Sequence, residues 1–249
     1  MTTQKKNRHI LRKLLIAVVL IAVICVGALY IYDLDYYRAD DTALAAMAGG
    51  EGVTVQETDD GLAFVPREAR AGFIFYPGGK VEHTAYAPLM QALAKEGVLC
   101  VLTDMPFHLA VLDMNAADGI ADKYPQVTRW SVGGHSLGGA MAASYAADHA
   151  EELDGLVLLA AYSTAELPET LATVSVYGSR DGVLDMDKYR AYRENLPSGA
   201  AEVVLTGGNH GQFGSYGHQD GDGTAEITAK EQLAQTVQAC LPVLLGLEE

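Results

Sequence analysis

One serine lies in a glycine-rich turn whose pattern could make it a nucleophile. Residues 134–138 read Gly-His-Ser-Leu-Gly, between an apolar run and the start of an alanine-rich segment. A sharp turn from strand to helix lifts such a serine hydroxyl above the edge of a sheet. The flanking glycines leave room for that turn, because a side chain at either position would clash across it. The predicted nucleophile elbow consists of Gly134, His135, Ser136 and Gly138.

A serine nucleophile needs a base that takes its proton. His210 follows an apolar run at residues 203–205 within a glycine-flanked loop. That position is the carboxyl end of a predicted strand, where catalytic groups of open α/β sheets gather. His149 is expected near the end of the helix that leaves the serine, pointing away from it. His218 stays a fallback, because it lies deeper in an irregular loop.

The base in turn needs an acid that orients it, and Asp181 is the predicted one. It follows an apolar run at residues 174–177 and precedes His210 by 29 residues, enough for one helix and one strand. An Asp-Gly pair after a strand is by itself only a turn, but the chain order Ser, Asp, His favours the catalytic interpretation. Asp185 and Asp187 are weaker alternatives.

Acyl chemistry also needs two donors for the negatively charged oxygen that develops on the substrate. The backbone N–H of Leu137, at the start of the predicted helix, is one. The second is expected in the Pro-Gly-Gly-Lys turn that follows the run at residues 73–76. The sequence does not separate Gly79 from Lys80 for this role.

Short apolar runs alternate with helical patterns along most of the chain, which predicts an α/β fold with a mainly parallel sheet flanked by helices. A hairpin is expected at residues 53–56 and 62–65. The remaining strands are predicted at 73–76, 98–102, 130–132, 156–161, 174–177 and 203–205. Helices are predicted at 85–96, 137–152 and 187–194, with a last one from Thr228, whose Thr-Ala-Lys-Glu start has capping-box spacing.

The N-terminal part predicts a membrane helix. Residues 1–13 carry five cations and no acid, and residues 14–32 carry no charged side chain. Such a helix approaches the ~30 Å thickness of bilayer hydrocarbon. The cations predict a cytoplasmic N-terminus at the cell membrane, a juxtamembrane linker at 33–52 and an outward-facing domain at 53–249. A cleaved signal peptide is the alternative, although the apolar core is long for one.

The composition excludes several kinds of partner and bound group. The formal net charge is −15, and beyond residue 13 only 12 basic residues face 32 acidic ones, so no basic face for nucleic acid is expected. Three cysteines without a Cys-x-x-Cys pair exclude a disulfide scaffold and a structural zinc site. Neither a metal nor an organic cofactor is predicted. The segment at residues 220–223 reads as a solvated turn, because its spacing does not match a calcium loop.

The motifs at 77–79 and 134–138, with Asp181 and His210 in that order, resemble the α/β-hydrolase superfamily over residues 53–246. Four stretches are similar to a compact, dienelactone-hydrolase-like branch with membrane-tethered bacterial members: residues 77–81, 129–130, 134–139 and 207–213. The resemblance implies an eight-strand-derived sheet and ester-hydrolase chemistry. Dienelactone hydrolases use a cysteine nucleophile where this chain has Ser136, so lactone specificity is not carried over.

Many relatives insert a helical cap where this chain has only the ten residues 162–171, so no large cap and an open groove are expected. Together these features predict a membrane-anchored serine hydrolase that cleaves a small-molecule carboxylic ester. In it, His210 deprotonates Ser136, and Asp181 holds the imidazole. Two alternatives stay open: an acyltransferase with the same triad, and a non-catalytic, hydrolase-like binding module.

Overall fold

The structure is a computed structural model that describes residues 2–247. Met1 of the predicted tail and the last two residues of the predicted domain lie outside the described residues. The chain divides into two compact units, Met1–Tyr36 and Tyr37–Glu249. Each unit is considered by itself.

The first unit is the helix α1 (Thr2–Asp33). Its stretch Arg8–Tyr32 is long and apolar enough to cross a membrane, and it contains the predicted span at residues 14–32. Large apolar side chains are exposed all around it, among them Leu15 and Ile24. A helix that is apolar on every side has no polar face to turn toward water. An anchor and a signal sequence both have this character.

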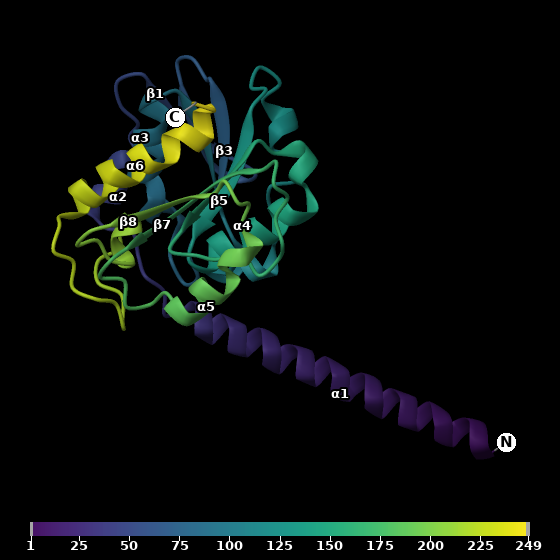
Figure 1. Cartoon of the computed structure of the whole chain (residues 1–249). Helices are drawn as coiled ribbons and strands as arrows, with labels where there is room; N and C mark the ends of the chain where they lie inside the picture. Colours follow the sequence, from purple (N-terminus) through teal and green to yellow (C-terminus); the bar gives the residue numbers. More distant parts are fainter. Residues whose placement is uncertain (1, 248–249) are drawn as a thin grey trace. The chain divides into compact units, whose positions relative to one another are not determined.

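The second unit is built on one eight-stranded sheet with the order β1-β2-β4-β3-β5-β6-β7-β8 (Figure 1). The predicted hairpin forms β1 and β2, and β2 pairs with β4 antiparallel. All other neighbouring strands pair parallel, so the predicted mainly parallel sheet is confirmed. The strands are β1 (Val53–Thr58), β2 (Gly61–Pro66), β3 (Ala71–Tyr76), β4 (Val98–Thr103), β5 (Trp130–His135), β6 (Gly155–Leu159), β7 (Ala172–Gly178) and β8 (Ala201–Leu205).

Helices cover both faces of the sheet, which explains why its strands read as continuous apolar runs. Alternate residues of β3 show the division: Phe73 and Phe75 pack into one core, and Ile74 and Tyr76 into the other. The first core lies under α2 (Asp41–Ala46), α3 (Ala87–Lys95) and α6 (Ala229–Leu245), and the second under α4 (Leu137–Asp148). The short α5 (Met186–Ala191) follows β7.

Three predicted elements end at least two residues earlier than expected. One is the helix expected over 187–194, which ends at Ala191, before the 3₁₀ turn η6 (Tyr192–Asn195). The other two are a helix and a strand. The helix expected over 137–152 ends at Asp148, where His149 is its C-cap and a separate 3₁₀ turn, η5 (Ala150–Glu152), follows. The strand expected over 156–161 ends at Leu159, because Ala160 takes a left-handed backbone with φ 48°. Both stops come from local backbone geometry that an apolar pattern does not record.

Residues 37–52, expected as linker, are packed on the domain. Ala43 of α2 is fully buried, and the Asp40 side chain caps this short helix by accepting the N–H groups of Thr42 and Ala43. The amide of Gln91 on α3 donates to the carbonyl oxygens of Ala46 and Gly49. The compact unit therefore begins at Tyr37 rather than at residue 53.

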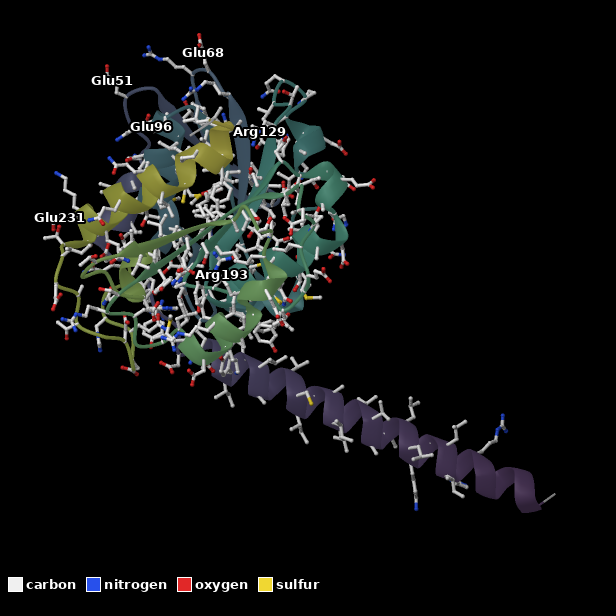
Figure 2. All side chains as sticks on the ribbon, in the orientation of Figure 1. Glu51, Glu68, Glu96, Arg129, Arg193 and Glu231 are labelled. Carbon is white, nitrogen blue, oxygen red and sulfur yellow. The ribbon has the colours of Figure 1, made fainter. Side chains whose placement is uncertain are left out.

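The last helix, α6, is fixed at both ends. The Thr228 hydroxyl accepts the N–H of Glu231 at 3.2 Å, and the Glu231 carboxylate accepts the N–H of Thr228 at 2.8 Å. Arg129 donates to the carbonyl oxygens of Val243 and Leu244. Figure 2 shows Glu231 and Arg129 at opposite ends of the helix. The predicted capping box is thus present, with a cation at the negative end of the helix dipole.

Replacing the cap should loosen α6 measurably. We expect Thr228→Ala to lower the free energy of unfolding by about 1 kcal/mol, because it leaves the Glu231 N–H without its acceptor. Urea unfolding of the detergent-solubilised chain measures this. Thr224→Ala, at an exposed loop position outside the helix, is the matched control. Equal losses from the two substitutions would contradict the capping role.

Candidate active site

Ser136 lies at the turn between β5 and α4, with φ 54° and ψ −122°. Its N–H donates to the carbonyl oxygen of Leu159 at 2.9 Å, which ties the turn to the neighbouring strand β6. A side chain on Gly134 or Gly138 would strike the backbone that carries Tyr76 and Pro77. The glycines of the motif are therefore required by close backbone approach, and the serine has the strained turn that the sequence predicts.

The parallel strands bring the predicted residues to one edge of the sheet. Ser136 follows the end of β5, Asp181 follows β7 and His210 lies beyond the end of β8. Ser136 and His210 line the same cavity of about 190 Å³. Most of its other walls are apolar: Leu137, Ala140, Ala160, Ala161, Val183 and Leu184.

Asp181 and His210 form a buried pair. The Nδ1 atom of His210 lies 2.8 Å from Oδ2 of Asp181, and both side chains are 1% exposed. The other oxygen, Oδ1, accepts the N–H groups of Val183 at 2.9 Å and Leu184 at 2.7 Å. Backbone donors of this kind stabilise the charged form of a carboxylate. Nε2 of His210 is buried and has no hydrogen-bond partner among the described residues, so it is available to accept a proton.

The structure separates the two candidates for the second oxyanion donor. The N–H of Lys80 already donates to the carbonyl oxygen of His108 at 2.9 Å. Within residues 2–247, the N–H of Gly79 makes no hydrogen bond, and this residue lies against Leu137: a Cβ added to Gly79 would be 3.0 Å from the Leu137 side chain. Of the two, Gly79 is therefore the available donor, and the N–H of Leu137 lies at the first position of α4.

The alternative residues have other roles. Asp185 caps α5 by accepting the N–H of Lys188, although it lines the cavity, and Asp187 is exposed. The ring of His149 stacks on Tyr145 at 4.1 Å, at the far end of α4. His218 is exposed and lines a different cavity from Ser136.

Asp222 has a role that the sequence does not predict. It was expected in a solvated turn, but its carboxylate accepts four backbone N–H groups. Oδ1 takes those of Gly182, His210 and Gly223 at 3.1, 3.2 and 2.8 Å, and Oδ2 takes that of Gly211 at 2.8 Å. Asp222 thereby joins the loop of Asp181 to the loop of His210. Spacing could not reveal this, because the contacts span up to 40 residues.

His135 packs against His210 and is bonded to Tyr86. Its Nδ1 atom lies 2.8 Å from the hydroxyl of Tyr86, which also accepts the N–H of Gly78 at 3.1 Å. Its ring centroid lies 4.4 Å from that of His210. Burial, with a smaller contribution from nearby His210, holds the pKa of His135 well below its usual value. This residue is therefore a neutral packing group that links the elbow to the oxyanion loop.

A buried neutral histidine makes stability depend on pH. The unfolded chain binds a proton at His135 below a pKa of about 6.5 and the folded chain does not, so folding weakens as the pH falls. We expect the wild-type chain to lose about 1 kcal/mol more than a His135→Gln variant between pH 6.5 and 5.5. Urea unfolding at both pH values measures this, with circular dichroism at pH 8 to show that the variant folds. Parallel losses would contradict the assignment.

Comparison with known proteins places the chain in a family. Residues 72–234 match the alpha/beta hydrolase family. No curated protein matches the chain. Among solved structures, a thermostable esterase from Pseudomonas putida is 16% identical, with 84% of this chain and 89% of that one covered and a TM-score of 0.57.

Two further solved structures share the fold. Thermogutta terrifontis esterase 2 is 16% identical, with 82% of this chain and 96% of that one covered and a TM-score of 0.53. A predicted CIB-like hydrolase from Thermoplasma acidophilum is 17% identical, with 75% and 98% covered and a TM-score of 0.52. At such identities the likeness shows the fold alone. The family match covers more than half of the sequence, and the chain therefore belongs to the alpha/beta hydrolase family.

Proposed function

We propose that the protein is a serine hydrolase that cleaves a carboxylic ester, with Ser136, His210 and Asp181 as its triad. The observation that carries this proposal is the buried pair of Asp181 and His210, in which the histidine lines the same cavity as Ser136. The three residues come from three turns at one sheet edge, and a serine triad needs its nucleophile, base and acid gathered in this way. Esterases among the structural neighbours agree with this choice.

In this mechanism Ser136 Oγ attacks the ester carbonyl carbon while its proton passes to Nε2 of His210. Asp181, whose Oδ1 atom is held by two backbone N–H groups, stabilises the imidazolium that forms. The N–H groups of Leu137 and Gly79 bind the oxyanion. The imidazolium then protonates the alcohol that leaves, and an acyl group remains on Ser136. A water molecule, deprotonated by His210, releases the acid and restores the serine.

For α1 we propose a membrane anchor. The exposed apolar stretch Arg8–Tyr32 supports it, as do the five cations before residue 14. By the positive-inside rule these cations stay cytoplasmic, which puts the hydrolase domain on the outer side of the cell membrane.

Loss of the nucleophile tests the proposed reaction. We expect Ser136→Ala to lower turnover of p-nitrophenyl acetate on the order of 10⁴–10⁶-fold, because the triad acts as a unit. It should also abolish labelling by a fluorophosphonate probe. Ser144→Ala, on the same helix α4, is the matched control and should keep both activities. Undiminished turnover by pure Ser136→Ala protein would reject the assignment.

Asp222 is expected to act as a positioning residue. Replacing it by alanine frees four backbone N–H groups next to the acid and the base, and misplacement by about 1 Å can cost on the order of 10²-fold. We expect Asp222→Ala to lower kcat about 10–100-fold, and Asp222→Asn, which keeps one acceptor oxygen, to fall between it and wild type. Asp220→Ala is the control on the same loop. If kcat stays at the wild-type value in Asp222→Ala, the loops do not need this link.

A further inference from the structure

An exposed apolar segment lies between β4 and β5. It contains two 3₁₀ turns, η2 (Pro106–His108) and η3 (Ala110–Leu112). Its large apolar side chains are well exposed: Phe107 by 36%, Val111 by 49%, Leu112 by 47% and Met114 by 44%. We call these four residues the η2–η3 patch. Scattered apolar side chains on a surface are ordinary, but four within eight positions indicate a contact surface.

The patch adjoins the candidate active site. The carbonyl oxygen of His108, within the same segment, accepts the N–H of Lys80 at 2.9 Å. A Cβ added to Gly79 would be 3.8 Å from the side chain of Leu109. The segment is thus bonded directly to the loop that carries the proposed oxyanion donor.

The start of the hydrolase domain is attached to this same loop. The N–H of Tyr37 donates to the carbonyl oxygen of Lys80 at 2.7 Å, and the carbonyl oxygen of Tyr37 accepts the N–H of Glu82 at 2.9 Å. Only residues 34–36 separate Tyr37 from the end of α1. The four residue steps from Asp33 to Tyr37 span about 14 Å at most, whatever the direction of the helix. The end of α1 is therefore connected to the oxyanion loop by a short stretch of chain.

We propose that the η2–η3 patch rests on the lipid surface and that the active site takes its ester from there. This inference depends on the proposed ester hydrolysis and on α1 as an anchor. Residues 105–114 contain no Lys or Arg, and Asp113 is their one acidic residue, so the contact relies on apolar side chains rather than on cations that attract lipid head groups. The domain's excess of acidic residues repels anionic lipid, so the partner that we propose is a neutral lipid surface, for which phosphatidylcholine vesicles serve as the probe.

The cavity limits which part of such an ester enters. The cavity is small, at about 190 Å³, and most of its lining side chains are apolar. One part of the ester, the acyl or the alcohol part, fits there. The other part is longer and apolar, and it stays outside, next to the patch. The substrate class is therefore an amphiphilic ester that partitions into a bilayer and has one short half.

A fluorescent probe on the patch tests the contact in the full-length chain. The chain is reconstituted in phosphatidylcholine vesicles with Cys25→Ser and Leu112→Cys, and it is labelled with an environment-sensitive dye. Cys100 and Cys240 are buried, so they do not compete for the dye. The matched probe is Val204→Cys on β8, which replaces a side chain that is 43% exposed. Nitroxide-labelled lipid should quench the dye at residue 112 and leave the dye at 204 bright.

Equal quenching at the two positions would overturn the proposal. The proposal would also fail if, without nitroxide lipid, fluorescence at residue 112 decreased as the number of chains per vesicle increased. The patch would then contact a second copy of the chain. The mass of the labelled protein is measured by mass spectrometry. A mass that shows the loss of α1 would also overturn the proposal, since no anchor would remain.

Kinetics separate this inference from the proposed function. We expect Val111→Ser with Leu112→Ser to lower turnover of a bilayer-partitioned acetate ester about tenfold, and to leave turnover of soluble p-nitrophenyl acetate unchanged. Val204→Ser should change neither. Equal losses on both esters would mean damage to the site and would overturn the proposal. If the wild-type chain cleaves neither ester, the proposed function fails, and the fluorescence result still decides the lipid contact.

Discussion

The backbone of Ser136 is held at φ 54° and ψ −122°, a conformation that costs a non-glycine residue about 1–3 kcal/mol. The surrounding structure imposes it. The N–H of Ser136 is bonded to β6, its carbonyl oxygen accepts the N–H of Ala140 in α4, and the adjacent backbone packs too closely for any side chain at Gly134 or Gly138. Because β5 and β6 are central strands of the sheet, the hydroxyl that the proposed chemistry needs is placed by the most buried part of the fold.

Unlike Ser136, the acid and the base are positioned by two loops that are hydrogen-bonded through shared partners. Asp181 comes from the loop after β7, and His210 comes from the loop after the edge strand β8. Here polar contacts replace apolar packing. The Asp222 carboxylate binds both loops through their N–H groups, and Gln232 of α6 accepts the N–H of Asn209 and donates to its carbonyl oxygen. The buried pair of Asp181 and His210 is tolerated there because the second carboxylate oxygen of Asp181 accepts two backbone N–H groups.

The sequence predicts well what a local pattern determines. The order of strands and helices, the elbow at residues 134–138 and the box at Thr228 depend on neighbouring residues, and the structure has them all. The sequence predicts poorly what depends on contacts with backbone groups far away along the chain. Gly79 and Lys80 are adjacent and equivalent in sequence, and only the carbonyl oxygen of His108, 28 residues further on, distinguishes them. The packing of residues 37–52 and the role of Asp222 were missed for the same reason.

The oxyanion loop shows how these distant contacts combine. The N–H of Gly78 is bonded to Tyr86, which also binds His135 under the elbow. The N–H of Lys80 is bonded to the apolar segment after β4, and its carbonyl oxygen to Tyr37 at the start of the domain. Gly79 lies between these fixed neighbours with its own N–H unused by the described residues. Its position therefore depends at once on three hydrogen bonds, which join Gly78 to Tyr86, Lys80 to His108 and Lys80 to Tyr37, so loss of any one of these bonds would alter the donor that the reaction would use.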